Sequence, residues 1–210
     1  MKQEILGWSP VPSQSIKVSD KSISSPCMEK RNLVPEIIDS LPKKTLNVKF
    51  QGRFLCPGDI LKPRNVKMMP ELEWKDDDSA LYTICMLDPD APSKADQRFR
   101  EFLHWLVVNA PMNNVKKGTT IAEYVGAAPP KGTGLHRYII LVYKQKEKLR
   151  CDEKKITSKT TSGRAMFSNK AFARKYDLGL LIAGNLFLSE WDEYVPKLYR
   201  QLHFCEWRYY

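Results

Sequence analysis

The sequence lacks the long apolar runs and the closely spaced cysteines that mark several large classes of protein. No stretch approaches the roughly 20 apolar residues that a membrane-spanning helix needs, and no apolar core follows a basic start in the first residues, as a secretory signal requires. The five cysteines form no CxxC pair, which disfavours a structural zinc site or a redox centre. We therefore expect reduced thiols in a cytoplasmic protein.

Several catalytic and nucleotide-binding signatures are missing as well. The chain contains no GxSxG elbow of a serine hydrolase, no GxxxxGKS/T phosphate loop and no HExxH metal motif. It also contains no zinc-finger, helix-turn-helix or RNP-like pattern, so we expect no nucleic-acid partner.

What the sequence does contain fits one globular domain with a β-rich core. The chain has 210 residues, of which 42% are hydrophobic, enough to bury a sizeable core. Its fourteen prolines and ten glycines suit a loop-rich fold better than a helical bundle. Residues 46–50 alternate between apolar and polar, which predicts a half-buried strand. Nearly continuous apolar runs predict buried strands at 81–87, 102–109 and 138–143.

Helical signals are fewer and lie outside these runs. Apolar residues at helical spacing predict a short helix over 34–41, which Pro42 ends. Two further helices are predicted over 169–176 and 190–202. The sum is a mostly β fold with a few peripheral helices.

The two ends of the chain differ in composition from its centre. Residues 1–28 are polar and serine-rich, and we expect a flexible extension there. We expect a single domain over 29–202, followed by an aromatic tail over 203–210.

The formal net charge of +10 is concentrated in one part of the chain. Residues 144–175, which we call the basic strip, contain eleven basic and only three acidic residues. Such a strip could meet an anionic membrane or an acidic protein surface, or it could be an ordinary solvated surface. The sequence alone leaves these alternatives open.

Two acidic residues follow directly on the predicted strand 81–87. Asp88 and Asp90 stand in the segment Asp-Pro-Asp-Ala-Pro-Ser, where each proline fixes its own φ and biases the residue before it towards extended structure. The carboxylates are therefore held rigidly and lose little entropy when they bind a ligand. The alternative is a plain turn in which the aspartates bond to local backbone groups.

A histidine interrupts the second apolar run. If the strand alternates regularly, His104 lies on the face opposite Leu103 and Trp105 and can point towards a cavity. The alternative is a core histidine whose hydrogen bonds are satisfied within the protein.

The most unusual segment is residues 126–138, which supplies three glycines, two prolines, a lysine, a histidine, an arginine and a tyrosine before a strand. Glycines let backbone N–H groups approach an anion, and His136, Arg137 and Tyr138 can donate to phosphate oxygens. The segment is therefore typical of an anion site, although a long surface loop would also account for it.

These three segments, taken together and in this order, resemble the signature regions of the phosphatidylethanolamine-binding proteins, also called Raf kinase inhibitor proteins. The resemblance runs from about Leu33 to Leu202. It implies a β-sandwich of a large antiparallel sheet and a smaller one, with a small anion pocket at one end. The pocket regions of the family fall on Asp88, Asp90, His104, Gly126, Pro130, His136 and Tyr199.

The resemblance also implies a function. Members of the family bind phosphate groups, phosphorylethanolamine headgroups and nucleotides, and some bind Raf-type kinases or inhibit serine proteases. We therefore expect a non-enzymatic binding protein for phosphate-bearing headgroups, without a cofactor or a metal, that could regulate a kinase or a serine protease.

Two alternatives remain open beside this expectation. Aspartate and histidine are the residue types of a metal-dependent phosphoesterase, and the chain offers both at Asp88, Asp90, His104 and His136. The basic strip could instead bind the chain to an anionic membrane as a peripheral protein.

The chain departs from the family pattern at three positions. Mammalian members have a second histidine where this chain has Leu103, and many members have a glycine where it has Ala128. The phosphorylatable serine of the mammalian proteins aligns with Ala171, which puts control by phosphorylation in doubt.

Overall fold

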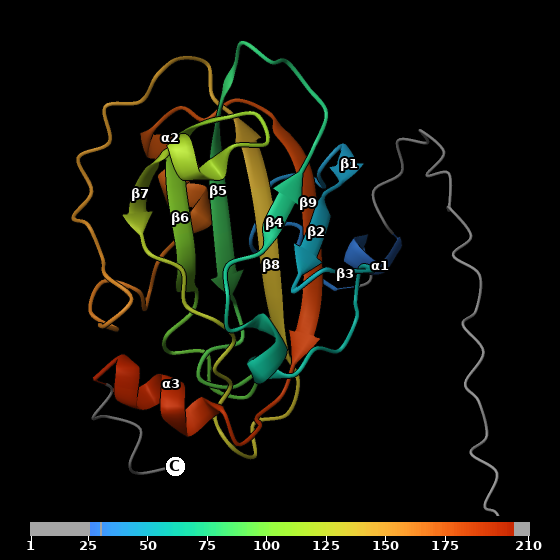
Figure 1. Ribbon diagram of the computed structural model, residues 1–210, viewed down its shortest axis with the longest axis vertical. Coiled ribbons are helices and arrows are strands. Elements are labelled where there is room, and N and C mark those ends of the chain that lie inside the picture. The colour runs from blue at the N-terminus through green and yellow to red at the C-terminus, as the bar shows by residue number, and fades with distance from the viewer. Residues whose placement is uncertain (1–25, 30, 204–210) are drawn as a thin grey trace, which may run out of the picture.

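Two β-sheets form the body of the computed structural model, which describes residues 26–29 and 31–203 (Figure 1). The larger sheet contains, in spatial order, β1 (Lys44–Thr45), β9 (Leu181–Ser189), β8 (His136–Lys144), β5 (Leu81–Asp88), β6 (Phe102–Pro111) and β7 (Thr119–Ala122). The smaller sheet contains β3 (Arg53–Phe54), β2 (Asn47–Phe50) and β4 (Glu71–Glu73). The helices are α1 (Pro26–Glu29), α2 (Asn169–Lys175) and α3 (Val195–Gln201), with 3-10 turns η1 (Pro63–Val66) and η2 (Val115–Lys117).

The predicted fold class, mostly β with a large and a small sheet and few helices, is confirmed. One detail differs, because the larger sheet is mixed: β1 pairs parallel with β9, whereas every other pairing within that sheet is antiparallel. Within the described residues, no helix is long and apolar enough to cross a membrane.

The larger sheet is covered on both faces, which explains why its central strands read as continuous apolar runs. Side chains on one face pack against the smaller sheet, where Phe187 stacks on Tyr138 at 5.1 Å between ring centroids and meets Phe50 edge-on at 5.5 Å. Side chains on the other face, among them Leu87 and Leu186, pack with Phe172 of α2 and with the segment that contains Ile37 and Ile38.

The expected helix over 34–41 is wrong. The segment makes a single turn, in which the Ile37 N–H donates to the Leu33 carbonyl at 2.8 Å, and it continues as turns and bends. Pro35 disfavours the α conformation at Val34, which is 40% exposed, while Leu33, Ile37 and Ile38 are buried. The helical spacing of the apolar residues reflects one buried turn.

The expected helix over 190–202 starts too early in the sequence, because α3 begins only at Val195. Asp192 accepts hydrogen bonds from the Tyr194 N–H at 2.9 Å and from Arg64 Nε at 2.7 Å, which holds the preceding residues in a turn. Pro196 lies in the first turn of the helix, where its missing N–H costs nothing.

The expected helix over 169–176 is present as α2, and the four expected strands are present as β2, β5, β6 and β8. The described structure begins at Pro26, and the buried Met28 lies near Gly184 of β9. Residues 1–25 and 204–210 lie outside the described residues, so the extension and most of the tail stay predictions. Among the described residues, Cys56, Cys85 and Cys151 form no disulfide.

We expect the aromatic contact between the sheets to contribute strongly to stability. Replacing Phe187 with Ala should lower the free energy of unfolding by about 3–5 kcal/mol, because the buried ring contacts both sheets and its loss leaves a cavity. Urea denaturation followed by circular dichroism measures this change. The matched control is Phe54→Ala on β3, whose ring is 59% exposed, and we expect a loss of less than about 1 kcal/mol. Equal losses in the two variants would contradict this packing.

Candidate functional site

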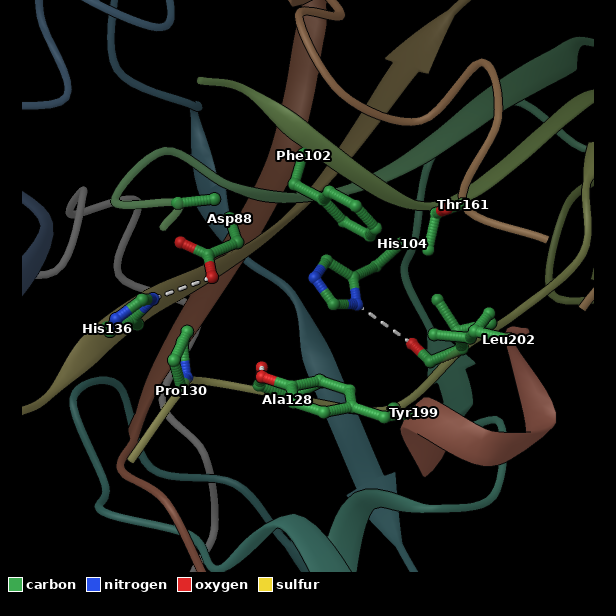
Figure 2. Close-up of a pocket in the computed structure, with 12 residues that line it drawn as sticks. Asp88, Phe102, His104, Ala128, Pro130, His136, Thr161, Tyr199 and Leu202 are labelled. Carbon is green, nitrogen blue, oxygen red and sulfur yellow. Dashed lines mark hydrogen bonds and ion pairs between the residues drawn. The ribbon is translucent and has the colours of Figure 1, made fainter. Parts of the chain in front are cut away.

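A small cavity lies beside α3, and Figure 2 shows the side chains that line it. In Figure 1, α3 lies at one end of the larger sheet. The volume of the cavity is about 30 Å³, which holds roughly two water-sized groups. The lining residues come from the ends of β5, β6 and β8, from the loop after β5, from the segment before β8, from the long loop before α2, and from α3 and its end. They are Asp88, Ala91, Phe102, His104, Val125, Gly126, Ala128, Pro130, His136, Thr161, Tyr199 and Leu202.

Asp88 supplies the negative charge of the cavity. It is the last residue of β5 and only 3% exposed. Its Oδ1 accepts from the Asp90 N–H at 2.8 Å, and its Oδ2 accepts from His136 Nδ1 at 2.9 Å (Figure 2). The buried Tyr138 hydroxyl also donates to this carboxylate. Because a carboxylate has about four acceptor sites, Asp88 retains acceptor capacity for a ligand.

Both ring nitrogens of His136 have partners within the protein. Because a carboxylate only accepts, Nδ1 carries the proton of the bond to Asp88. Nε2 lies 2.8 Å from the Thr133 hydroxyl, which in turn lies 2.8 Å from the Pro130 carbonyl. These contacts hold the imidazole in one orientation, and a ligand reaches Nε2 only if Thr133 moves.

His104 presents a ring nitrogen to the cavity. Its Nδ1 lies 3.0 Å from the Val125 carbonyl, which can only accept, so Nδ1 carries the proton and neutral Nε2 has a lone pair. Figure 2 shows Nε2 facing the space between Asp88 and Pro130. Burial lowers the pKa of His104 to about 4, although the nearby Asp88 carboxylate opposes this shift. The side chain is therefore neutral at pH 7.

The expected regular alternation around His104 is wrong. Met86 pairs with Trp105 and Leu87 pairs with Leu103, so His104 is the extra residue of a β-bulge. As a result, Trp105 packs towards the smaller sheet and Leu103 packs on the opposite face. The bulge aims the imidazole at the end of the sheet, between the rings of Phe102 and Tyr138, each 5.1 Å away.

Gly126, Pro130 and Tyr199, which the family resemblance assigns to a pocket, also line the cavity, and their role in ligand binding stays a prediction. The Tyr199 hydroxyl donates to the Ala128 carbonyl at 3.0 Å, which ties α3 to the segment before β8. At Gly126 a Cβ atom would meet the Val66 carbonyl oxygen at 2.7 Å, closer than real contacts allow. Only glycine lets this segment pass so close to η1.

Asp90 does not line the cavity, which corrects one of the predicted positions. Its carboxylate is fully buried and accepts from the backbone N–H of Arg137 at 2.8 Å, from Arg137 Nε at 3.0 Å and from Nη2 at 2.7 Å. Burial alone would raise the pKa of Asp90, but these bonds outweigh it and hold the pKa below its ordinary value. Asp90 and Arg137 thus join the loop after β5 to the start of β8.

Other lining residues went unnoticed in the sequence. Phe102 and Leu202 were visible only as apolar residues, and nothing marked Thr161 within a polar loop. Arg164 explains how Thr161 reaches the cavity. Its guanidinium is fully buried and donates to the carbonyls of Thr160, Leu103, His104, Glu123 and Thr157 at 2.8–3.3 Å.

No carboxylate pairs directly with Arg164 in the described residues, and burial lowers its pKa to about 10. The guanidinium therefore stays charged at pH 7. It fixes the loop of residues 157–164 against the start of β6, directly behind His104.

The donor set of a metal site is not assembled here. Among the described residues, no group of three or more histidine, cysteine, aspartate and glutamate side chains lies close enough to hold a metal ion. The four candidate residues do not converge on one point. The Asp90 carboxylate binds Arg137, and both ring nitrogens of His136 have partners within the protein.

The basic strip does not form one uniform face. Lys144, Lys146, Lys170, Arg174 and Lys175 lie within 4 Å of carboxylates, and Arg164 is buried. Five exposed residues of the strip have no carboxylate partner within the described chain: Lys148, Arg150, Lys154, Lys155 and Lys159.

We expect the Asp90–Arg137 pair to contribute more to stability than to binding. Asp90→Ala removes the closest carboxylate of the Arg137 guanidinium, leaves Glu36 at 3.9 Å, and should lower the free energy of unfolding by about 3–5 kcal/mol. Asp96→Ala, which removes the exposed partner of Arg98, should cost about 1 kcal/mol or less. Urea denaturation at pH 7 measures both.

The pH dependence of the same pair has a definite sign. Because folding lowers the pKa of Asp90, its contribution is present above the unfolded pKa of about 3.9 and is lost as pH falls through the lower folded value. The stability gap between the wild type and Asp90→Ala should therefore narrow below about pH 4. A gap that stays constant down to pH 2 would contradict this account.

Comparison with known proteins adds a family to this geometry. Residues 40–186 match the family model described as phosphatidylethanolamine-binding protein. A candidate odorant-binding protein of Drosophila melanogaster, named A5, is 41% identical over 177 residues, which cover 84% of each chain.

Solved structures agree with the fold. The carboxypeptidase Y inhibitor, in a crystal structure with its cognate proteinase, superposes with a TM-score of 0.69 at 27% identity, covering 80% of this chain and 95% of that one. A phosphatidylethanolamine-binding protein from Plasmodium vivax superposes with a TM-score of 0.61 at 20% identity, covering 79% of this chain and 96% of that one.

Proposed function

Because the chain belongs to the phosphatidylethanolamine-binding protein family, we propose that it binds phosphate-bearing headgroups, foremost phosphorylethanolamine, without catalysing a reaction. The family consists largely of non-catalytic binders and inhibitors. The observation that carries the proposal is the convergence of Asp88 and His104 on one small, buried cavity.

The two charged ends of the headgroup suit these two side chains differently. Asp88 is a carboxylate with acceptor capacity to spare, and it suits the ammonium group. His104 is neutral in the empty cavity and can accept but not donate through Nε2. A phosphate oxygen therefore binds Nε2 only when that nitrogen takes up a proton.

Two contacts within the site are compatible with a protonated His104 or favour it. The Nδ1 bond to the Val125 carbonyl persists on protonation, because Nδ1 remains a donor. The negative charge of Asp88 also favours the imidazolium. Ligand binding should then be coupled to the uptake of about one proton by His104.

We predict that affinity for glycerophosphorylethanolamine rises as pH falls from 8 to 6, by up to about tenfold per pH unit for one proton. This phosphodiester does not titrate in that range, so the proton belongs to the protein. Isothermal calorimetry in two buffers with different ionisation enthalpies measures both the affinity and the number of protons taken up.

The variants His104→Asn and His203→Gln sharpen the test. Asparagine can still donate to the Val125 carbonyl but offers no second nitrogen, so binding should weaken at least tenfold and lose its pH dependence. His203 is exposed and does not line the cavity, so its replacement should change neither quantity. Affinity that falls as pH falls would contradict a phosphate at His104 and indicate an ammonium there instead.

Proteinase inhibition is a second candidate, because the carboxypeptidase Y inhibitor is 27% identical to this chain in an alignment that covers 80% of this chain and 95% of the inhibitor. An inhibition assay with carboxypeptidase Y, using the wild type and His104→Asn, separates this activity from headgroup binding. Kinase regulation and a cytoplasmic location remain parts of the proposal that rest on the family resemblance and on the sequence.

A further inference from the structure

A second cavity lies at the smaller sheet, away from the cavity beside α3. Its volume is about 210 Å³, whereas the cavity beside α3 measures about 30 Å³. In Figure 1, β3 lies on the right-hand side of the sheets, and α3 lies below them on the left. The lining residues come from the hairpin of β2 and β3, from the segment after β3 and from η1. They are Phe50, Gln51, Arg53, Phe54, Leu55, Leu61 and Asn65.

The floor of this second cavity is apolar. Phe50, Leu55 and Leu61 are each no more than 7% exposed, and the ring of Phe54, which is 59% exposed, forms a wall. A cavity of roughly 150 Å³ lined by such side chains is large enough to bind one benzene molecule. The second cavity therefore has room for one aromatic ring and a short polar group.

A positive charge stands beside this apolar floor. A two-residue turn at Gln51 and Gly52, both with positive φ, joins β2 to β3. Arg53 pairs with Phe50 across the turn, so the two side chains lie on the same face, the one on which Phe50 meets the larger sheet. Arg53 is exposed, and no carboxylate of the described residues forms a salt bridge with it.

The segment around the second cavity contains little negative charge. Residues 47–68 include five basic residues and a single acid, Asp59. The Asp59 carboxylate already accepts from the Cys56 N–H at 3.1 Å. The side-chain amides of Gln51 and Asn65 add neutral hydrogen-bond donors to the lining. The cavity is thus complementary to a ligand with an apolar body and a negatively charged end.

We propose that the second cavity binds a small aromatic carboxylate. The ring packs on Phe50, Phe54 and Leu61, where two phenyl rings offer edge-to-face or offset contacts. The carboxylate binds the Arg53 guanidinium, whose planar fork of N–H groups matches two carboxylate oxygens. An inorganic phosphate ion fits less well, because it loses water against the apolar floor without gaining a contact there. This site goes beyond the proposed headgroup function and does not depend on it.

The 3-10 turn η1 stands between the two cavities. Asn65 lines the second cavity, whereas the carbonyl of the next residue, Val66, accepts from the Tyr124 hydroxyl at 2.6 Å. The same carbonyl oxygen would lie 2.7 Å from a Cβ atom at Gly126, which lines the first cavity. Among the described residues the two linings share no side chain, so each site can be tested without altering the other.

The probe is 3-phenylpropionate, in which a short linker joins a phenyl ring to a carboxylate, and 3-phenylpropionamide is its uncharged match. Titration of the nitrogen-15-labelled full-length protein at pH 7, followed through its backbone amide shifts, measures both affinities. We expect 3-phenylpropionate to bind in about the millimolar range, since so small a ligand makes few contacts. The shifts should centre on Gln51, Arg53 and Asn65. The amide should bind at least about tenfold more weakly.

Two variants remove the same charge from the same segment. Arg53 lines the second cavity, whereas Lys62 is exposed and does not line it. Arg53→Gln should weaken binding of 3-phenylpropionate at least about tenfold and leave binding of the amide unchanged. Lys62→Gln should stay within about threefold of the wild type for both probes. Equal losses in the two variants would show that only net charge matters and would overturn the proposal.

The aromatic wall is tested by Phe54→Ala, which replaces an exposed side chain. This variant should weaken binding of both probes, by roughly threefold to tenfold, because the lost ring contacts the phenyl group of each. Unchanged affinity in Phe54→Ala would overturn the placement of the ring. Absence of any shift with 3-phenylpropionate in the wild type would overturn the proposal and would leave a protein chain as the occupant of the cavity.

A further measurement keeps this proposal apart from headgroup binding. His104→Asn should bind 3-phenylpropionate with the affinity of the wild type, because His104 does not line the second cavity. Shifts centred on Gly126 and His136 would place the probe in the first cavity and would overturn the proposal. Loss of glycerophosphorylethanolamine binding in His104→Asn with unchanged binding of 3-phenylpropionate would support both proposals.

Discussion

A buried carboxylate at the end of a core strand is the constraint on which the cavity depends. Asp88 is 3% exposed, and leaving such a charge without partners costs several kcal/mol. The backbone N–H of Asp90 and the imidazole of His136 meet that need. The first bond folds the loop after β5 back on itself, and the second fixes the start of β8. The Asp88 charge also acts on His104, where it opposes the effect of burial on the pKa.

Two aspartates two residues apart take opposite roles because their surroundings differ. Asp90 is enclosed by a guanidinium that satisfies both of its oxygens, so its charge is used within the protein. Asp88 accepts from one N–H group on each oxygen and from the Tyr138 hydroxyl, and it faces the cavity with one acceptor site left for a ligand. The chain thus separates a carboxylate that holds the loop in place from one that is available for binding.

Much of this arrangement could be predicted from the sequence. The central strands were evident because both faces of the larger sheet are buried, and six of the seven predicted positions line one cavity. The strand β9 was missed, because Gly184 and Asn185 interrupt its apolar run. Tertiary contacts explain why these two residues stand in the strand. A Cβ atom at Gly184 would meet Pro42 at 3.0 Å, and the Asn185 side chain donates to the Leu46 carbonyl at 2.8 Å.

The remaining differences also come from tertiary contacts that no local pattern contains. The bulge at His104 depends on the register between β5 and β6, and the pairing of Asp90 depends on Arg137, 47 positions away. Whether a polar residue faces a ligand or another side chain is decided by such distant partners. The residue types of a site are therefore easier to predict than the division of roles among them.

The central claim is that His104 is a neutral imidazole in the empty cavity and takes up a proton when a phosphate group binds. Nitrogen-15 NMR of histidine-labelled protein at pH 7 observes both ring nitrogens of His104 directly. The account predicts that Nδ1 alone carries a proton without ligand, and that Nε2 becomes protonated as glycerophosphorylethanolamine saturates the site. A saturated site with Nε2 of His104 still unprotonated would contradict it.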